Sequence, residues 1–577
     1  MRTGLMAAVV AIALQTVAEP SGTAILTGSV VTDSPSPQPV RHATVRLAGP
    51  AGMSARIVGT DDDGKFEFVA LPAGSYSVSA SKIGSVTTFY GAKRPGRGPG
   101  VPVALLDGER ASIVLKLLAG AVITGTIADQ HGRPAAGVPV LAVDTRADAP
   151  APARALTDDR GVYRIYGLAP GDYVVSAVPR PGTTSVSVGV SAALAVTDAQ
   201  ARWAQSPAGA APPAGRPMEY APIYFPGVTN ARAASRVLVT AGEEHGNVGF
   251  ALQIVPTATI AGTLIDHTGQ PLNAATVTLY PRKTDQPDAS DAVFTSGAIT
   301  LPRATVAAPK FSIVGVAPGE YTLVARSGSG TRSTAAALSA APPLWNLTDV
   351  TINGEDQTDL VLRLQPGVKI AGSIAFEQTV LTPPADLGVL DITLAALGSQ
   401  VGAPATPRAI VTKPASFQFL SVMPGTYALT VMPPAAGWTL KSAMVNGQDL
   451  ADATLDLKIG EDLAGVTLTF TDRPTEFGGR LIDPSGRPVS KYSIVVFTVD
   501  RSMWRPYSRR IRAVAPATDG SFRVTGLPPG DYAVAAAEDV EPADLADPAF
   551  LSQLLASSVK FTLAEGEKKR QDLRTGG

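Results

Sequence analysis

Residues 167–177 read GLAPGDYVVSA and place a proline, a glycine and a tyrosine in a tight bend between two apolar runs. Proline fixes the direction in which a chain approaches such a bend, and glycine permits backbone conformations that are closed to other residues. Related segments recur along the chain: ALPAGSYSVSA from Ala70, GVAPGEYTLVA from Gly315, SVMPGTYALTV from Ser421 and GLPPGDYAVAA from Gly526. A bend that recurs in this way indicates a repeated structural unit.

The tyrosine two positions after each bend glycine is suited to cover the edge of a β-sandwich with its ring. Its hydroxyl is expected to bond a nearby backbone group, as in a tyrosine corner. The recurrence of this residue favours a structural role over a catalytic one. The predicted structural bend residues are Gly74, Tyr76, Gly171, Tyr173, Gly319, Tyr321, Gly425, Tyr427, Gly530 and Tyr532.

The bend glycines are spaced by 97, 148, 106 and 105 residues, so one unit has about 100 residues, which is enough for a sandwich with its own core. The longer second unit carries an insertion rich in alanine, proline and serine. We expect a signal peptide at 1–18, then β-sandwiches at 22–118, 119–256 (with the insertion at 178–219), 257–365, 366–472 and 473–577.

Alternation of apolar and polar residues with period two predicts strands such as Val122–Ala128 and Val138–Val143. Residues 157–177 predict a hairpin. The expected fold is all-β, with about five tandem antiparallel β-sandwiches of immunoglobulin-like or prealbumin-like type. Short helices are expected within 193–206 and within 547–558, where Asp547 is placed as a cap and Pro548 in the first turn.

The N-terminal segment has the features of a secretory signal. Arg2 precedes ten apolar residues, Leu5–Leu14, and Ala18 fits a cleavage site. No later stretch reaches the roughly 18–20 apolar residues that span a bilayer. We therefore expect an exported protein, periplasmic, extracellular or peripherally attached to the cell surface, without a transmembrane segment after cleavage.

Composition excludes several classes of site. The chain has no cysteine, which excludes disulfides, thiolate metal sites and a lipid-modified cysteine, so a lipoprotein is not expected. A net charge of −1 gives no general reason to expect nucleic acid as a partner.

The segments TDDRGVYRIYGLAPGDYVVSA (157–177) and ATDGSFRVTGLPPGDYAVAA (517–536) resemble the carboxypeptidase regulatory-like domain. This is a transthyretin-like β-sandwich related to starch-binding-like and collagen-adhesin B-type modules. The corresponding segments of the third and fourth units lack the aspartate–glycine turn. The resemblance implies domains that are generally not catalytic.

Residue patterns also give no active site. The four histidines form no HExxH motif, and the chain has no GxSxG nucleophile elbow and no P-loop. Carboxylates gather at Thr60–Phe66 and Thr157–Tyr163, but calcium needs six or more oxygen ligands, and aspartate and glycine are also the residues that turns select. We favour turns and expect no enzyme activity, no metal and no cofactor.

Two aromatic clusters are candidates for ligand binding. YAPIYFPGV (220–228) and its counterpart TTFYGA (87–92) could stack on sugar rings, although packing against their own sandwich is favoured. DRSMWRPYSRRIR (500–512) could bind carboxylated or sulfated glycans or an acidic protein surface, although a strand pair with a solvated basic face and one Arg–Trp stack is favoured. The candidate ligand-binding residues are Phe89, Tyr90, Tyr220, Tyr224, Phe225, Trp504, Arg505, Tyr507, Arg509 and Arg510.

The leading functional hypothesis is a non-catalytic exported protein that binds carbohydrate or another component of the cell envelope. One alternative is a structural spacer or scaffold for contacts with protein partners. Another is an accessory subunit of a separately encoded peptidase or transporter.

Overall fold

The computed structural model describes residues 22–50, 53–98, 100–146, 151–178, 193–194, 196–206, 210–212, 215–282, 304–307, 309–327, 343–397 and 406–575. The expected signal peptide and a large part of the expected insertion lie outside these residues. In the described part of the chain, no helix combines the length and the apolar character needed to cross a bilayer. The chain divides into two compact units, of which the first contains the residues up to Ala119 together with Val489–Lys491 and Ala515–Gly520, and the second contains the rest.

The described residues form five β-sandwiches, numbered 1 to 5 along the chain, which share one plan. In one sheet, the first strand of each sandwich lies between an antiparallel strand and a parallel strand that comes from its end. In the other sheet, the strand with the corner tyrosine lies between antiparallel neighbours. This confirms tandem β-sandwiches. The parallel pairing is a feature that the alternation of residues did not reveal, because the period of two is the same in both kinds of sheet.

Sandwich 1 lies in the first compact unit and sandwich 2 begins the second. The strands of sandwich 1 are β1 (Ala24–Thr32), β4 (Lys65–Leu71) and β8 (Arg110–Leu117), facing β2 (Thr44–Ala48), β3 (Arg56–Gly59), β5 (Gly74–Ser81), β6 (Thr88–Phe89) and β7 (Val103–Leu105). Those of sandwich 2 are β9 (Ala121–Ala128), β12 (Val162–Leu168), β18 (Glu244–His245) and β19 (Phe250–Ala251), facing β10 (Pro139–Asp144), β11 (Ala153–Leu156), β13 (Gly171–Ala177), β16 (Ile223–Tyr224) and β17 (Arg236–Val239).

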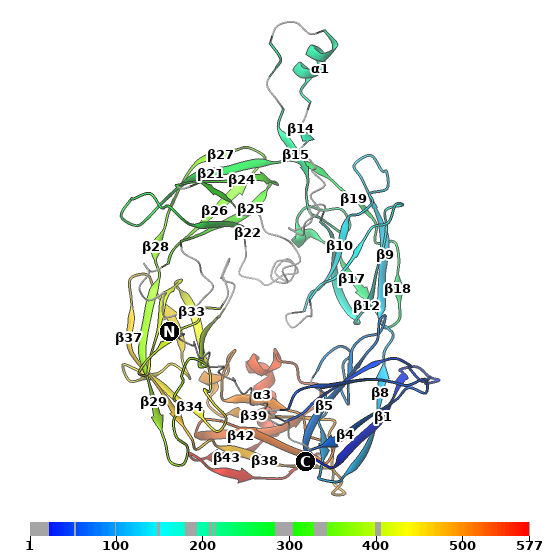
Figure 1. Ribbon diagram of the computed structural model, residues 1–577, viewed down its shortest axis with the longest axis vertical. Coiled ribbons are helices and arrows are strands. Elements are labelled where there is room, and N and C mark those ends of the chain that lie inside the picture. The colour runs from blue at the N-terminus through cyan, green and yellow to red at the C-terminus, as the bar shows by residue number, and fades with distance from the viewer. Residues whose placement is uncertain are drawn as a thin grey trace, which may run out of the picture. The chain divides into compact units, whose positions relative to one another are not determined.

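Sandwich 2 also carries an excursion, which Figure 1 shows leaving through β14 and returning through β15. Its elements are β14 (Ala193–Leu194), α1 (Asp198–Gln205) and β15 (Pro217–Tyr220), with β20 (Ile254–Pro256) completing a three-stranded sheet; the 3-10 helix η1 (Ala231–Ala233) follows β16.

The strands of the other three sandwiches all lie in the second compact unit. Sandwich 3 has β21 (Ala258–Ile265), β23 (Thr305–Ala307), β24 (Lys310–Val316) and β27 (Gln357–Arg363), with β22 (Thr276–Pro281), β25 (Gly319–Arg326), β26 (Leu344–Ile352) and β28 (Gln365–Pro366). Sandwich 4 has β29 (Val368–Glu377), β31 (Ile410–Thr412), β32 (Ser416–Val422), β34 (Thr439–Val445), β35 (Gln448–Asp449) and β37 (Leu463–Thr471), with β30 (Asp391–Ala396), β33 (Gly425–Met432) and β36 (Thr454–Leu457). Sandwich 5 has β38 (Glu476–Ile482), β41 (Ser521–Thr525), β44 (Lys568–Arg570) and β45 (Leu573–Arg574), with β39 (Ser493–Thr498), β40 (Ile511–Val514), β42 (Gly530–Ala537) and β43 (Val559–Leu563), and also η3 (Arg501–Met503), η4 (Asp544–Ala546) and α3 (Pro548–Ala556).

The expected hairpin at 157–177 is wrong. β12 pairs with β9, whereas β13 pairs with β10, β16 and β17, so the two strands belong to different sheets. Both strands bury residues in the same core, and the bend at Pro170–Gly171 carries the chain from one sheet across to the other. The expected helices are confirmed, and Asp547 caps α3 by accepting a hydrogen bond from the backbone N–H of Ala549 at 2.9 Å.

A glycine in the first strand of each sandwich faces an aromatic residue on the antiparallel neighbour. The cross-strand pairs are Gly28 with Phe66, Gly125 with Tyr163, Gly262 with Phe311, Gly372 with Phe417 and Gly479 with Phe522. On its other side, the glycine lies against the parallel strand. A Cβ at Gly262, for example, would lie 2.0 Å from the carbonyl oxygen of Leu360. Glycine is therefore required at these positions because another backbone approaches too closely for a side chain.

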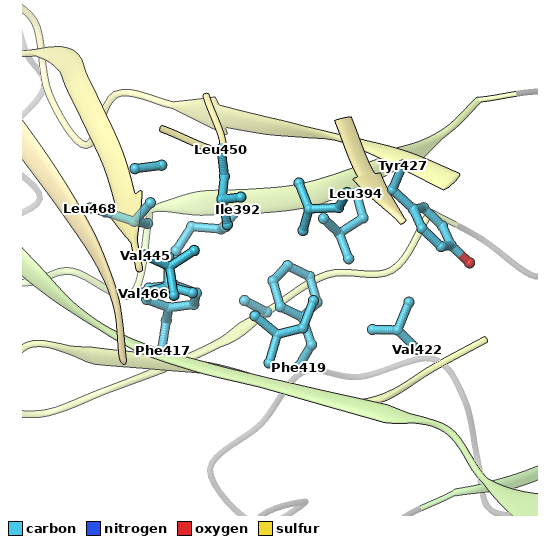
Figure 2. Packing of buried hydrophobic residues seen from close by; sticks show 14 of the residues in the cluster. Ile392, Leu394, Phe417, Phe419, Val422, Tyr427, Val445, Leu450, Val466 and Leu468 are labelled. Carbon is cyan, nitrogen blue, oxygen red and sulfur yellow. The ribbon is translucent and has the colours of Figure 1, made fainter. Parts of the chain in front are cut away.

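Each core is formed by the facing sides of the two sheets. In sandwich 4, Figure 2 shows Phe417 and Phe419 from one sheet packed against Ile392 and Leu394 from the other, with Tyr427 at one end. Sandwiches 1, 2 and 3 have separate clusters of the same kind. The sandwiches therefore have individual cores, while the domain limits given in the sequence analysis remain predictions.

Candidate functional site

The five corner tyrosines all use their hydroxyl groups inside their own sandwich. Each hydroxyl donates to the backbone carbonyl four residues earlier, from Tyr76, Tyr173, Tyr321, Tyr427 and Tyr532 to Pro72, Ala169, Ala317, Met423 and Pro528 at distances of 2.5, 2.8, 2.9, 2.8 and 2.6 Å. Burial raises the pKa of Tyr173, Tyr321 and Tyr532 to about 12. A neutral, buried donor of this kind closes the bend and is poorly suited to proton transfer at neutral pH.

The bend glycines meet different constraints. Gly171 and Gly530 have φ angles of +157° and +151°, a region that other residues rarely adopt. Gly74 has no such angle, but a Cβ there would lie 2.6 Å from the Pro50 side chain. The glycine of the repeated bend is therefore required for different reasons in different sandwiches: the backbone angle in two of them and a close contact in another.

The aspartates at the predicted turns accept backbone hydrogen bonds. Asp61 Oδ1 accepts from the N–H of Lys65 at 2.7 Å, and Asp158 Oδ1 accepts from the N–H groups of Arg160 and Val162 at 2.9 and 2.8 Å. These bonds lower the pKa of Asp158. Among the described residues, no group of three or more histidine and acidic side chains is arranged to hold a metal ion.

In the aromatic cluster at 220–228, Tyr224 and Phe225 lie beside β13, the strand with the corner tyrosine, whereas Tyr220 is the last residue of β15. Tyr224 in β16 faces Ser176 of β13, and its side chain is only 2% exposed. Phe225 packs on Phe250 with the ring centroids 6.3 Å apart, and the Tyr220 hydroxyl donates to Gln130 Oε1 at 2.5 Å. The rings of this cluster contribute to the packing of sandwich 2.

The counterpart in sandwich 1 occupies the same structural position. Phe89 in β6 faces Ser79 of the corner strand β5, as Tyr224 faces Ser176 in sandwich 2. Both Phe89 and Tyr90 are half-buried, and Tyr90 packs against the core of sandwich 1.

The two aromatic residues of the segment 500–512 differ in exposure, because Trp504 is buried and Tyr507 is exposed. Trp504 is 6% exposed, its Nε1 donates to the carbonyl of Thr498 at 2.8 Å, and its ring lies 6.0 Å from that of Phe497. Tyr507 is 66% exposed and has a φ angle of +60°. Such an angle is rare for an aromatic residue, and outliers of this kind gather at binding sites and switches.

The arginines of this segment meet acidic residues that the sequence analysis did not single out. Arg509 Nε donates to Asp452 Oδ1 at 2.8 Å, and Arg510 Nε and Nη2 donate to Asp452 Oδ2 at 2.9 and 2.7 Å. The Arg509 Nη2 group also reaches Asp449 Oδ2 at 3.1 Å. Arg505 is close enough to be influenced by the charge of Asp452 as well.

These ion pairs are shielded from solvent. The side chains of Asp452, Arg509 and Arg510 are 10%, 14% and 15% exposed. Burial alone would raise the pKa of Asp452, but the two guanidinium groups outweigh it and lower the pKa below its ordinary value. The anion that this arginine cluster holds therefore comes from within the chain. The sequence signal for the acidic side was the Asn446–Gly447 dipeptide, which is typical of a tight hairpin and places Asp449 and Asp452 just after it.

The repeated bend, the paired sheets and the buried tyrosines define a tandem β-sandwich protein. Residues 25–115 and 122–202 match the family model of the carboxypeptidase regulatory-like domain, so the resemblance seen in the sequence is confirmed for these two segments. No curated protein matches the chain.

Several solved structures are similar in part. The minor pilin GBS52 of Streptococcus agalactiae is 14% identical, with 41% of this chain and 97% of the pilin covered and a TM-score of 0.22. BcpA, the major pilin subunit of Bacillus cereus, is 10% identical, with 55% and 99% covered and a TM-score of 0.15. A putative carbohydrate-binding protein of Pseudomonas aeruginosa is 18% identical, with 17% and 90% covered and a TM-score of 0.12.

Proposed function

We propose that this chain is a non-catalytic, exported array of β-sandwiches that acts as an adhesive or structural scaffold in contact with proteins of the cell envelope. The observation that carries the proposal is where the repeated residues lie. The corner tyrosines and the glycine–aromatic pairs recur in every sandwich, and both serve packing. An array that repeats its internal architecture, with loops of different sequence, is suited to hold surfaces at fixed spacing.

Export rests on the N-terminal sequence, in which Arg2 and the apolar run Leu5–Leu14 precede Ala18. Placement in the periplasm or at the outer surface is part of the proposal. Fractionation of cells that express the full chain tests it. Recovery of a processed form outside the cytoplasm supports export, and an unprocessed form confined to the cytoplasm contradicts it.

Photo-cross-linking in those cells tests the scaffold function. A photoreactive amino acid at Leu238 or Val314, two exposed apolar positions on strands, should give covalent adducts of discrete mass with envelope proteins. The same amino acid at Tyr224 is the matched control, because that side chain is buried and should give no adduct with another protein. If the exposed positions give no adducts while the protein is correctly exported, the scaffold proposal fails.

Carbohydrate binding is a second candidate, favoured by Tyr507, which is exposed, has a positive φ angle and follows Arg505 by two residues. Sugars stack on exposed aromatic rings, and a guanidinium group suits a carboxylate or sulfate substituent. A glycan array with the full chain and with Tyr507→Ala tests it. Saturable binding that is lost in Tyr507→Ala supports the candidate, and absence of binding to every glycan rejects it. Trp504→Ala is unsuitable as the decisive variant because Trp504 is buried in an apolar cluster with Phe497 and Leu551 of α3.

A further inference from the structure

The hairpin formed by β34 and β35 is an addition to the common plan of the sandwiches. In sandwich 4, the sheet order is β31-β32-β29-β37-β34-β35, so two strands continue beyond the parallel strand β37. In the described parts of the other sandwiches, the corresponding sheet ends at its parallel strand. The hairpin turns at Asn446 and Gly447, with φ angles of +48° and +79°, as expected for a two-residue turn of this type.

The hairpin is anchored in the core of sandwich 4. Figure 2 shows Val445 beside Val466 and Leu450 near Ile392, and all four side chains belong to the buried cluster of sandwich 4. Asp449 stabilises the turn, because its Oδ1 accepts from the N–H groups of Ala443 and Ala451 at 2.8 and 3.0 Å. The hairpin is therefore a rigid surface whose outer groups have fixed positions.

A β-bulge in β34 provides backbone carbonyl groups that accept hydrogen bonds from sandwich 5. The register with β37 shifts between Leu440 and Ser442, which leaves Lys441 as the extra residue. The carbonyl oxygens of Leu440 and Lys441 accept from Arg509 Nη1 at 2.9 and 3.0 Å. The Arg509 guanidinium thus bonds two backbone carbonyls and two carboxylates of the hairpin region, and this planar fork of donors is one that lysine cannot reproduce.

In sandwich 5, the arginines that contact the hairpin are held in position by other residues of the same sandwich. Trp504 fixes the segment that precedes the arginines by its packing and its bond to Thr498. Arg510 is held at the corner, where its Nη1 donates to the carbonyl of Pro529 at 3.0 Å and contacts the Tyr532 hydroxyl at 3.3 Å. A second contact between the two sandwiches is formed by Lys441 Nζ and Glu565 Oε1 at 3.0 Å.

We propose that the β34–β35 hairpin is a docking surface for sandwich 5, and that the contact of Arg509 and Arg510 with Asp452 locks sandwiches 4 and 5 into one rigid pair. Neighbouring domains of a chain move relative to each other unless their interface is well packed or strongly bonded. Here the contact is made by buried charges with several hydrogen bonds each, and removal of Asp452 leaves the buried Arg510 guanidinium without its hydrogen bonds to a carboxylate. This inference does not depend on the proposed function.

Electron paramagnetic resonance distance measurements on the full chain test the proposal. The chain has no cysteine, so Asp456→Cys in β36 and Lys560→Cys in β43, both exposed positions, give one label on each sandwich without background. The otherwise native chain should give a single narrow distance distribution. Asp452→Ala should abolish the narrow peak and give a broad distribution.

Two further variants make the result specific. Arg509→Lys keeps the charge and removes the fork, and it should also broaden the distribution. Arg408→Ala is the matched control, because it removes an Arg–Asp pair, with Asp391 at 2.6 Å, that lies entirely within sandwich 4, and it should leave the distribution narrow. A circular dichroism spectrum like that of the native chain verifies that each variant is folded. A broad distribution in the otherwise native chain, or a narrow one in folded Asp452→Ala, overturns the proposal.

Discussion

At the scale of single residues, the glycine in the first strand of each sandwich allows close packing of its neighbours. An aromatic ring lies opposite it on the antiparallel strand. The aromatic ring covers the space that the glycine leaves open, and the parallel strand lies against the other side of the glycine. Tyr163 shows the arrangement most fully, because its hydroxyl donates to the carbonyl of Val248 at 2.6 Å across Gly125. Burial raises the pKa of Tyr163 well above its ordinary value, which keeps this donor protonated.

We predict that Gly125→Ala destabilises sandwich 2. A Cβ at this position would lie 2.0 Å from the carbonyl oxygen of Val248, so a strand must shift, and overpacking of this kind typically costs about 1–3 kcal/mol. Chemical denaturation followed by intrinsic fluorescence measures the loss. The matched control is Gly246→Ala, because Gly246 has nothing within 4 Å of its expected Cβ, and its effect should be small. Equal losses in the two variants would contradict the explanation by close approach.

Ala70 leads to a prediction of the opposite sign. It lies at the register shift before the first bend with a φ angle of +56°, whereas the equivalent Gly167 and Gly315 have +76° and +71°. This conformation costs a residue with a Cβ about 1–2 kcal/mol of folding free energy. Glycine avoids this strain but loses more conformational entropy on folding, so the net gain from the substitution is smaller. Ala70→Gly should therefore stabilise sandwich 1 by about 1 kcal/mol. The comparison variant Gly167→Ala should lower stability by a similar amount in thermal unfolding, and a loss of stability in Ala70→Gly would refute the argument.

The sequence was informative about some residues and not about others. The bend glycines and tyrosines could be found because they recur in a contiguous motif. The first-strand glycines recur at similar places, but their requirement depends on a parallel strand that comes from about 85 to 125 residues later, as in the pairing of Gly28 with Ile113 and the approach of Val248 to Gly125. Close approach of two backbones leaves no compositional pattern other than the glycine itself.

At the scale of elements, the corner tyrosine connects the bend to the strand that follows it. The corner strand lies between antiparallel neighbours, and its tyrosine bonds the carbonyl just before the bend. This explains why the chain can cross from one sheet to the other in a few residues. Alternation predicted strands such as Val122–Ala128 and Val138–Val143, but it could not show that β12 and β13 lie in different sheets, because a strand has the same period whichever neighbour it pairs with.

Because the pKa of the corner tyrosines is raised by folding, we predict that the protein loses stability at alkaline pH. Their pKa is about 10 in the unfolded chain and is raised to about 12 for Tyr173, Tyr321 and Tyr532 in the folded chain. The stabilisation is complete below pH 10. As the pH rises from 10 to about 12, the unfolded chain releases these protons first, and stability falls by about 1.4 kcal/mol per pH unit for each tyrosine.

Urea unfolding across this pH window measures the slope. Tyr321→Phe removes one titrating group from sandwich 3 and should make the pH dependence of that sandwich shallower, at the cost of about 1 kcal/mol for the lost hydrogen bond at neutral pH. A slope that is unchanged in Tyr321→Phe would show that other groups cause the alkaline transition.

At the scale of the whole molecule, the sequence predicts the number of sandwiches better than their mutual contacts. From the sequence, the arginine cluster at 500–512 is a candidate site for an external anion or, as favoured, a solvated basic face. In the structure, Arg509 instead bonds Asp452, which lies 57 residues earlier in a different sandwich. A cluster of arginines has the same appearance in a sequence whether its anion belongs to a ligand or to the same chain. Only the fold brings the hairpin of sandwich 4 to this segment.

Separate cores predict that the sandwiches unfold one at a time under force. The buried clusters of sandwiches 1 to 4 are distinct, and a sandwich of roughly 100 residues releases about 35 nm of chain when it extends. Pulling the full chain by its ends in a single-molecule experiment should give about five such steps. Gly125→Ala should lower the force of one step and leave the others unchanged, because its effect is confined to sandwich 2. Two large steps in place of five would show that sandwiches 2 to 5, which form one compact unit, also unfold as one, and the sandwich would then not be the unit of mechanical stability.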